Sequence, residues 1–139
     1  CRGVDVLRTW LYFLVAQKVL KTALPVHLLT EEKMHTLKPE HETSLMSLGD
    51  AITCFIRGCE YPFELLVEPA FAYVKQLHGR GKVTPLEKAK SKLEDDLSKG
   101  YQPELELMFY WENPENILGE SFERFTLEIL DPVWRAFLG

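Results

Sequence analysis

The chain has 139 residues, of which 46% are hydrophobic and 27% charged, and a formal net charge of −5. This composition is typical of a folded globular domain and excludes a disordered or fibrous chain. The longest apolar run, residues 10–16, is well short of the about 20 residues of a membrane-spanning helix, so no membrane partner is predicted.

Residues 1–139 have the length of a single domain, which we expect them to form. Because the sequence begins with neither methionine nor a signal peptide, we expect a processed product or a fragment of a longer protein, and we favour the fragment. Its three cysteines cannot all pair with one another, and their spacing lacks the repeated framework of a small secreted scaffold. A reducing, cytoplasmic location is therefore predicted.

The first predicted element is a helix over Val4–Leu20, where twelve of seventeen residues are apolar. Because a helix that is apolar all round is usually enclosed, we expect it to be buried on most sides. The run VHLLT at residues 26–30 predicts a short strand. Residues 31–44 are polar and are interrupted by Pro39, which indicates a loop or a weak hairpin.

A second helix is predicted over Thr43–Arg57, with Gly58 as the residue that ends it. Residues 63–68 follow a proline and are expected to be extended or to form a short strand before residues 70–77 become helical. The sequence HGRGK at residues 78–82 predicts a flexible joint. The apolar face of the second helix is expected to carry Leu45, Leu48, Ile52 and Phe55.

The clearest helix start is at Thr84, because its hydroxyl can cap the amide of Glu87 while the glutamate reaches back, and Pro85 needs no intrahelical donor. The buried stripe of this helix is predicted to comprise Leu86, Ala89, Leu93 and Leu97, with Gly100 ending it.

A closing helix is predicted from residue 118 onward, and Pro132 is expected to bend it or to start a new turn. Its apolar side comprises Leu118, Phe122, Phe125, Ile129 and Val133, widened by Trp134 and Phe137. Together these elements predict an α+β fold that is mostly helical with two or three short strands.

Cys54 and Cys59 raise the question of a metal site or a catalytic thiol. On one helix they would point about 140° apart, and no usual zinc-ligand spacing is offered by His27, His35, His41 and His78. A catalytic cysteine would need a histidine and an orienting group close in space. We predict structural cysteines, no catalytic residue and no metal ligand.

An active magnesium-dependent nuclease using Asp5, Glu31 and Lys33 is an alternative. Nucleases of the restriction-enzyme type use an aspartate and then a Glu-x-Lys pattern on an adjacent strand, because two carboxylates hold the ion and the lysine positions water. Here Asp5 begins a predicted helix, and the Glu-x-Lys pattern falls in a polar loop. The sequence context therefore favours a solvated loop.

The segment from Lys75 to Lys92 holds six cations and one acid, whereas residues 94–131 hold eleven acids and two cations. Its LHGRGKV stretch lacks the spacing of a phosphate-binding P-loop. The candidate DNA-binding residues are Lys75, Arg80, Lys82, Lys88, Lys90 and Lys92. Because the whole chain is acidic, we expect other domains or subunits to provide most of the affinity for DNA.

The pattern LxxLxxAIxxFIRGCEYPFELLVEPAFAYVK, which begins at Leu45, resembles the C-terminal domain of RecC, the gamma subunit of bacterial exodeoxyribonuclease V. In that family a helix ends in a glycine, and a proline, an apolar run, a second proline and an aromatic segment follow. The matching positions are Gly58, Pro62, Phe63–Val67, Pro69 and Phe71–Tyr73.

Other parts of the chain are also similar to this family. The opening LRTWLYFLVAQ resembles a family helix through Arg8, Trp10 and Leu11, and KAKSKLEDDL resembles a later helix. The acidic tail that leads to Pro132 is similar to the family's chain end. Residues 31–42 carry no family signature.

The resemblance implies a non-catalytic scaffold and DNA-handling domain of the RecBCD helicase–nuclease, which acts in double-strand-break repair by homologous recombination. It implies the C-terminal part of an inactive nuclease lobe of the restriction-endonuclease (PD-(D/E)xK) type. The expected partners are the RecB and RecD subunits, double-stranded DNA ends and unwound single strands. No cofactor is expected in this domain, and Mg and ATP would be used by the partner subunits. A helical protein–protein interaction module unrelated to DNA is a further alternative.

Overall fold

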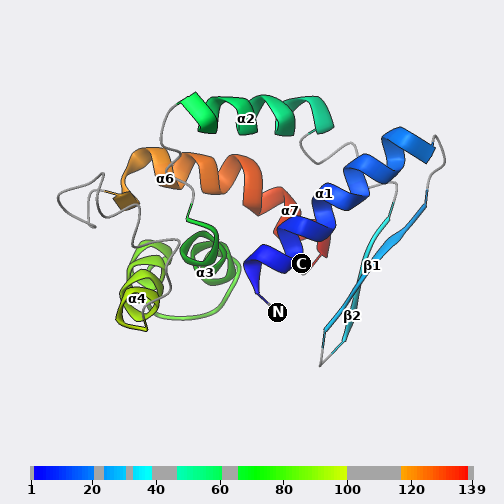
Figure 1. The fold of residues 1–139 in the computed structure, drawn as a ribbon. Coiled ribbons are helices and arrows are strands. Elements are labelled where there is room, and N and C mark those ends of the chain that lie inside the picture. The colour runs from blue at the N-terminus through cyan, green and yellow to red at the C-terminus, as the bar shows by residue number, and fades with distance from the viewer. Residues whose placement is uncertain are drawn as a thin grey trace. The chain divides into compact units, whose positions relative to one another are not determined.

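The computed structural model describes residues 2–20, 24–30, 33–38, 47–60, 66–99 and 117–137, and at 58–60 it describes the backbone alone. The described residues are mostly helical with one two-stranded antiparallel sheet, which confirms the predicted mostly helical α+β class (Figure 1). Two compact units are formed, one by residues 1–63 with 132–139 and the other by residues 64–131. The single-domain expectation stays a prediction.

In the first unit, helix α1 (Gly3–Leu20) has two different faces. One face is buried through Val6, Trp10, Phe13 and Leu14. The other face is exposed, and it also carries a stripe of apolar residues at helical spacing. These residues are Val4, Leu11, Tyr12, Val15 and Val19. The helix itself is confirmed, but the prediction that it is buried on most sides is wrong, because its apolar residues form two stripes of which only one is covered.

Strands β1 (Val26–Leu29) and β2 (Met34–Leu37) form an antiparallel hairpin, and β1 lies against α1. The Thr30 hydroxyl donates to the Lys33 carbonyl at 2.7 Å and so closes the turn. In β2 the His35 ring is buried, and its Nδ1 lies 3.0 Å from the Phe137 carbonyl oxygen. The predicted strand is confirmed, and of the two readings of the polar segment the hairpin is the correct one.

Helix α2 (Leu48–Glu60) begins after Ser47, whose hydroxyl accepts from the Asp50 amide at 3.2 Å. This start lies several residues after the predicted one. The prediction that Gly58 ends the helix is wrong, because the helix continues to Glu60. Ile52 and Phe55 belong to the predicted apolar face, but that face is exposed at both residues, to 51% and 73%. Leu45 lies outside the described residues.

The second unit is built around helices α3 (Val67–Leu77) and α4 (Pro85–Ser98), which pack against each other. The first buries Ala70 and Val74, and the second buries Ala89 and Leu93. Residues 67 and 68 were predicted to be extended, but α3 already begins there. Pro69 falls in its first turn, where a missing N–H group costs no hydrogen bond.

Helix α4 begins as predicted. The Thr84 hydroxyl accepts from the Glu87 amide at 3.2 Å, and the Glu87 carboxylate accepts from the Thr84 amide at 2.9 Å, which completes a capping box. In the predicted stripe, Ala89 and Leu93 are buried, whereas Leu86 is exposed and Leu97 is half-buried. Lys99 caps the end of the helix.

The closing segment consists of helix α6 (Glu120–Phe125), the π-helical turn η3 (Thr126–Leu130) and helix α7 (Asp131–Phe137). The Asp131 amide bonds to the carbonyl of Thr126, five residues earlier. This wider turn precedes Pro132, which has no N–H group to continue the regular pattern. The predicted apolar side is confirmed at Leu118, Phe122, Ile129, Val133 and Phe137, which are buried, whereas Phe125 and Trp134 are half-buried.

Candidate nucleic-acid interface

All six predicted DNA-binding residues lie in the second unit, on α3, on α4 and on residues 78–84, which we call the α3–α4 connection (Figure 1). Lys75 is in the last turn of α3, and Arg80 and Lys82 are in the connection. Lys88, Lys90 and Lys92 follow in the first half of α4. All are exposed except Lys92. The structure therefore brings five exposed cations onto one continuous helix–connection–helix segment.

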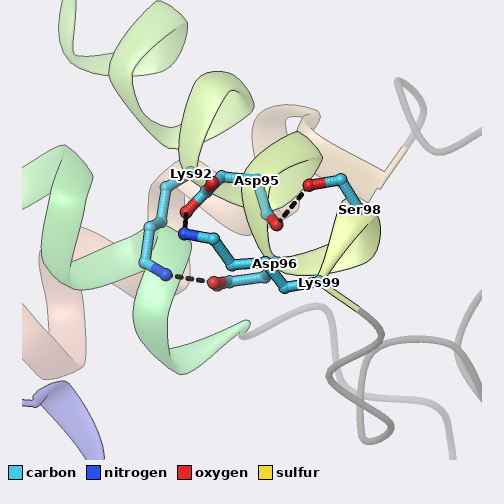
Figure 2. A network of polar contacts seen from close by, with 5 residues as sticks. All are labelled: Lys92, Asp95, Asp96, Ser98 and Lys99. Atoms are coloured by element: carbon cyan, nitrogen blue, oxygen red, sulfur yellow. Dashed lines mark hydrogen bonds and ion pairs between the residues drawn. The ribbon is translucent and has the colours of Figure 1, made fainter.

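Lys92 is half-buried and forms an ion pair within α4. Its Nζ bonds to Oδ1 of Asp96, one turn later on α4 (Figure 2). The Asp96 side chain is only 5% exposed. Burial of the Lys92 ammonium lowers its pKa, but the hydrogen bond and charge of Asp96, with the charges of Glu68 and Asp95, outweigh this, so the pKa is raised. Lys92 thus serves to neutralise a buried carboxylate.

Charge is segregated along α4. Its first half carries the exposed cations, whereas its second half carries Glu94, Asp95 and Asp96. Figure 2 shows Lys99 directed at Asp95, with Nζ and Oδ2 2.6 Å apart. The hydrogen bond from Lys99 lowers the pKa of Asp95, so this carboxylate keeps its charge. The unpaired positive charge that a polyanion could contact therefore lies at the beginning of α4 and in the connection.

The α3–α4 connection was predicted to be a flexible joint, but hydrogen bonds hold it at both ends. Gln76 Nε2 donates to the Val83 carbonyl at 2.7 Å. The same amide lies so close to Gly81 that a Cβ atom there would collide with it. At the start of the connection the His78 amide bonds to the carbonyls of Val74 and Gln76.

Two further contacts tie α3 to the closing segment. His78 Nε2 lies 2.5 Å from Oδ1 of Asp131, whose side chain is 8% exposed. The Tyr73 hydroxyl donates to the Glu123 carboxylate at 2.8 Å, and the Tyr73 ring packs edge-on against Phe122 with centroids 6.2 Å apart. Burial, with the hydrogen bond to Glu123, raises the pKa of Tyr73 to about 12. Sequence reasoning missed both contacts, because no local pattern links residues 50 or more positions apart.

The residues of the nuclease alternative lie in the first unit. Asp5 is paired with Arg2, whose Nε lies 3.2 Å from its Oδ2. Lys33 is exposed in the hairpin turn, and Glu31 lies outside the described residues. Across the described ranges, no three His, Cys, Asp or Glu side chains are grouped as metal ligands.

Cys54 is a half-buried free thiol, and its structural role stays a prediction. The side chain of Cys59 lies outside the described residues. Within the part of the chain that the structure describes, no helix has the length and hydropathy needed to span a bilayer. Comparisons with protein-family models, curated proteins and solved structures find no match to this chain.

Proposed function

We propose that this chain is a non-catalytic scaffold and DNA-handling domain of the RecC type, acting in the RecBCD helicase–nuclease during double-strand-break repair. Its helices and hairpin would then be the C-terminal part of a nuclease-type lobe that lacks the active site. RecB and RecD would be its partners in the cytoplasm, and they would use the Mg and ATP. The resemblance of the sequence to that family supports this assignment.

One structural observation supports the DNA-handling part of the proposal. Four of the six predicted DNA-binding residues are exposed and make no hydrogen bond or ion pair through their side chains to any described residue: Lys75, Arg80, Lys82 and Lys88. These side chains are exposed to solvent, and the backbone that carries Arg80 and Lys82 is held by hydrogen bonds. Cations placed in this way can contact phosphate groups, and such contacts do not depend on the base sequence. Because the chain is acidic overall, these contacts position the duplex, and other subunits supply most of the affinity.

The double variant Arg80→Glu/Lys82→Glu tests this contact. Anisotropy of a labelled blunt-ended duplex, titrated at several salt concentrations with the assembled complex that contains the chain, reports the affinity and its salt dependence. We expect the variant to bind about tenfold more weakly at low salt, and the slope of log K against log salt to become shallower by about 2, since each lost phosphate contact removes about 0.9.

The matched control is Arg8→Glu/Lys33→Glu, which makes the same change of charge at exposed positions of the first unit. If only net charge matters, both variants will weaken binding equally, and the proposed interface is wrong. A slope unchanged in the Arg80→Glu/Lys82→Glu chain would contradict it as well.

The family assignment has a separate test in the encoding gene. If the chain is RecC-like, the coding sequence upstream of it should encode two helicase-like but degenerate domains. An upstream region without them would remove the assignment to RecBCD, whatever the DNA-binding result.

A further inference from the structure

His78 occupies the junction between α3 and the connection that carries Arg80 and Lys82. Its backbone amide donates to carbonyls of the last turn of α3, so the position of the His78 backbone is fixed by the helix. The ring then extends to Asp131, 53 residues later, with Nε2 and Oδ1 2.5 Å apart. Because a carboxylate only accepts hydrogen bonds, Nε2 is the nitrogen that carries the proton in this contact.

Asp131 is held in place by burial and by a backbone hydrogen bond. Its side chain is 8% exposed, and its backbone amide bonds to the Thr126 carbonyl within the π-helical turn. Asp131 directly follows η3, which packs against α3 within the second unit. The bond from His78 therefore fastens the start of the connection to the body of the unit.

The far end of the connection is fastened independently. Gln76 Nε2 donates to the Val83 carbonyl, and Thr84 begins the capping box of α4. Arg80 and Lys82 thus lie on a short backbone segment held on both sides. Ordering of loops and side chains at an interface costs affinity, and this cost is smaller when the loop is held before the ligand binds.

We infer that His78, through Asp131, is a positioning residue that holds the α3–α4 connection so that Arg80 and Lys82 face the phosphates of a DNA backbone. The inference rests on the proposed DNA-handling function and adds a residue that carries no phosphate contact itself. It separates two contributions to binding: the charges of Arg80 and Lys82 determine the salt dependence, and the His78–Asp131 bond determines how well their backbone is ordered.

The test compares His78→Ala with His78→Gln in the same duplex titration. Alanine removes the bond to Asp131, so we expect affinity to fall about threefold to tenfold with the salt slope unchanged. Glutamine places an amide donor close to the position of Nε2 and should restore the affinity. Order parameters of the amides of residues 79–82 should fall in the alanine variant and recover in the glutamine variant.

His27→Ala is the matched control, because it removes a ring from β1 in the first unit and should leave duplex binding unchanged. If circular dichroism shows that His78→Ala has lost helix, His78→Asn replaces it, since its shorter amide suits a helix end but does not reach Asp131.

Three results would overturn the inference. Wild-type affinity in His78→Ala would remove it while leaving the proposed interface intact, provided that Arg80→Glu/Lys82→Glu still weakens binding. Equal weakening by His78→Ala and His78→Gln would show that the bond to Asp131 is not what matters. If the assembled complex binds the duplex equally well with the wild-type chain and with Arg80→Glu/Lys82→Glu, the proposed interface and this role fail together.

Discussion

Phe122→Ala should lower the free energy of unfolding by about 3–5 kcal/mol, the usual cost of emptying a large aromatic site in a core. Phe122 is 0% exposed, and its ring packs edge-on against Tyr73, so the variant loses both buried area and an aromatic contact. Urea unfolding followed by circular dichroism measures this change as a lower midpoint with an unchanged slope.

Phe55→Ala on α2 is the control, because the same atoms are removed from a ring that is 73% exposed. We expect it to change the free energy of unfolding by less than about 0.5 kcal/mol, as for most surface substitutions. A cost for Phe55→Ala close to that of Phe122→Ala would show that the ring of Phe55 is covered in solution.

Lys92→Met should lower the free energy of unfolding by about 2–3 kcal/mol. Methionine keeps much of the apolar stem but leaves the Asp96 carboxylate buried without a cation, and the Oδ2 atom of Asp96 already has no hydrogen-bond partner. The expected cost is below that of breaking a fully buried pair, because the Lys92 side chain is 33% exposed and solvent screens it. Urea unfolding again provides the measurement.

The chain contains a matched pair for comparison on the same helix. Lys99 and Asp95 have the same four-residue spacing, but their side chains are 58% and 46% exposed. Lys99→Met should therefore be nearly neutral. Adding Asp96→Leu to Lys92→Met should recover most of the lost stability, because the buried charge is then absent. No recovery in the double variant would mean that the uncompensated charge of Asp96 is not the cause of the lost stability.

The elements that the sequence predicted well are those encoded by neighbouring residues. At Thr84 the hydroxyl, the proline and the glutamate required for a capping box all lie within four positions, so tertiary structure did not need to be known. The stripe from Leu118 to Val133 was also predictable, because regular spacing of bulky apolar residues is a strong helical signal.

The errors arose where a local signal permits more than one outcome. Gly58 tolerates the conformation that ends a helix but does not require it, and α2 continues past it. Spacing shows which residues share a face of a helix, but not which face is covered. Ile52 and Phe55 share a face as predicted, yet that face is exposed.

For the candidate interface, the sequence identified the six cations but did not show which of them are paired or what holds the connection in place. An acid four positions later follows both Lys92, as Asp96, and Lys90, as Glu94, so spacing alone could not separate Lys92 from the other five residues. The bond between His78 and Asp131 had no such signal, because only folding brings together residues 53 positions apart.

The two-faced character of α1 has a practical consequence for work with this protein. Its exposed stripe includes Tyr12, Val15 and Val19, which are 64%, 44% and 69% exposed. Environment-sensitive dyes such as ANS fluoresce on apolar surface of this kind, and their fluorescence is commonly taken as a sign of a molten globule. With this chain the native state should itself bind such a dye, so loss of native packing in a variant is better judged from near-ultraviolet circular dichroism.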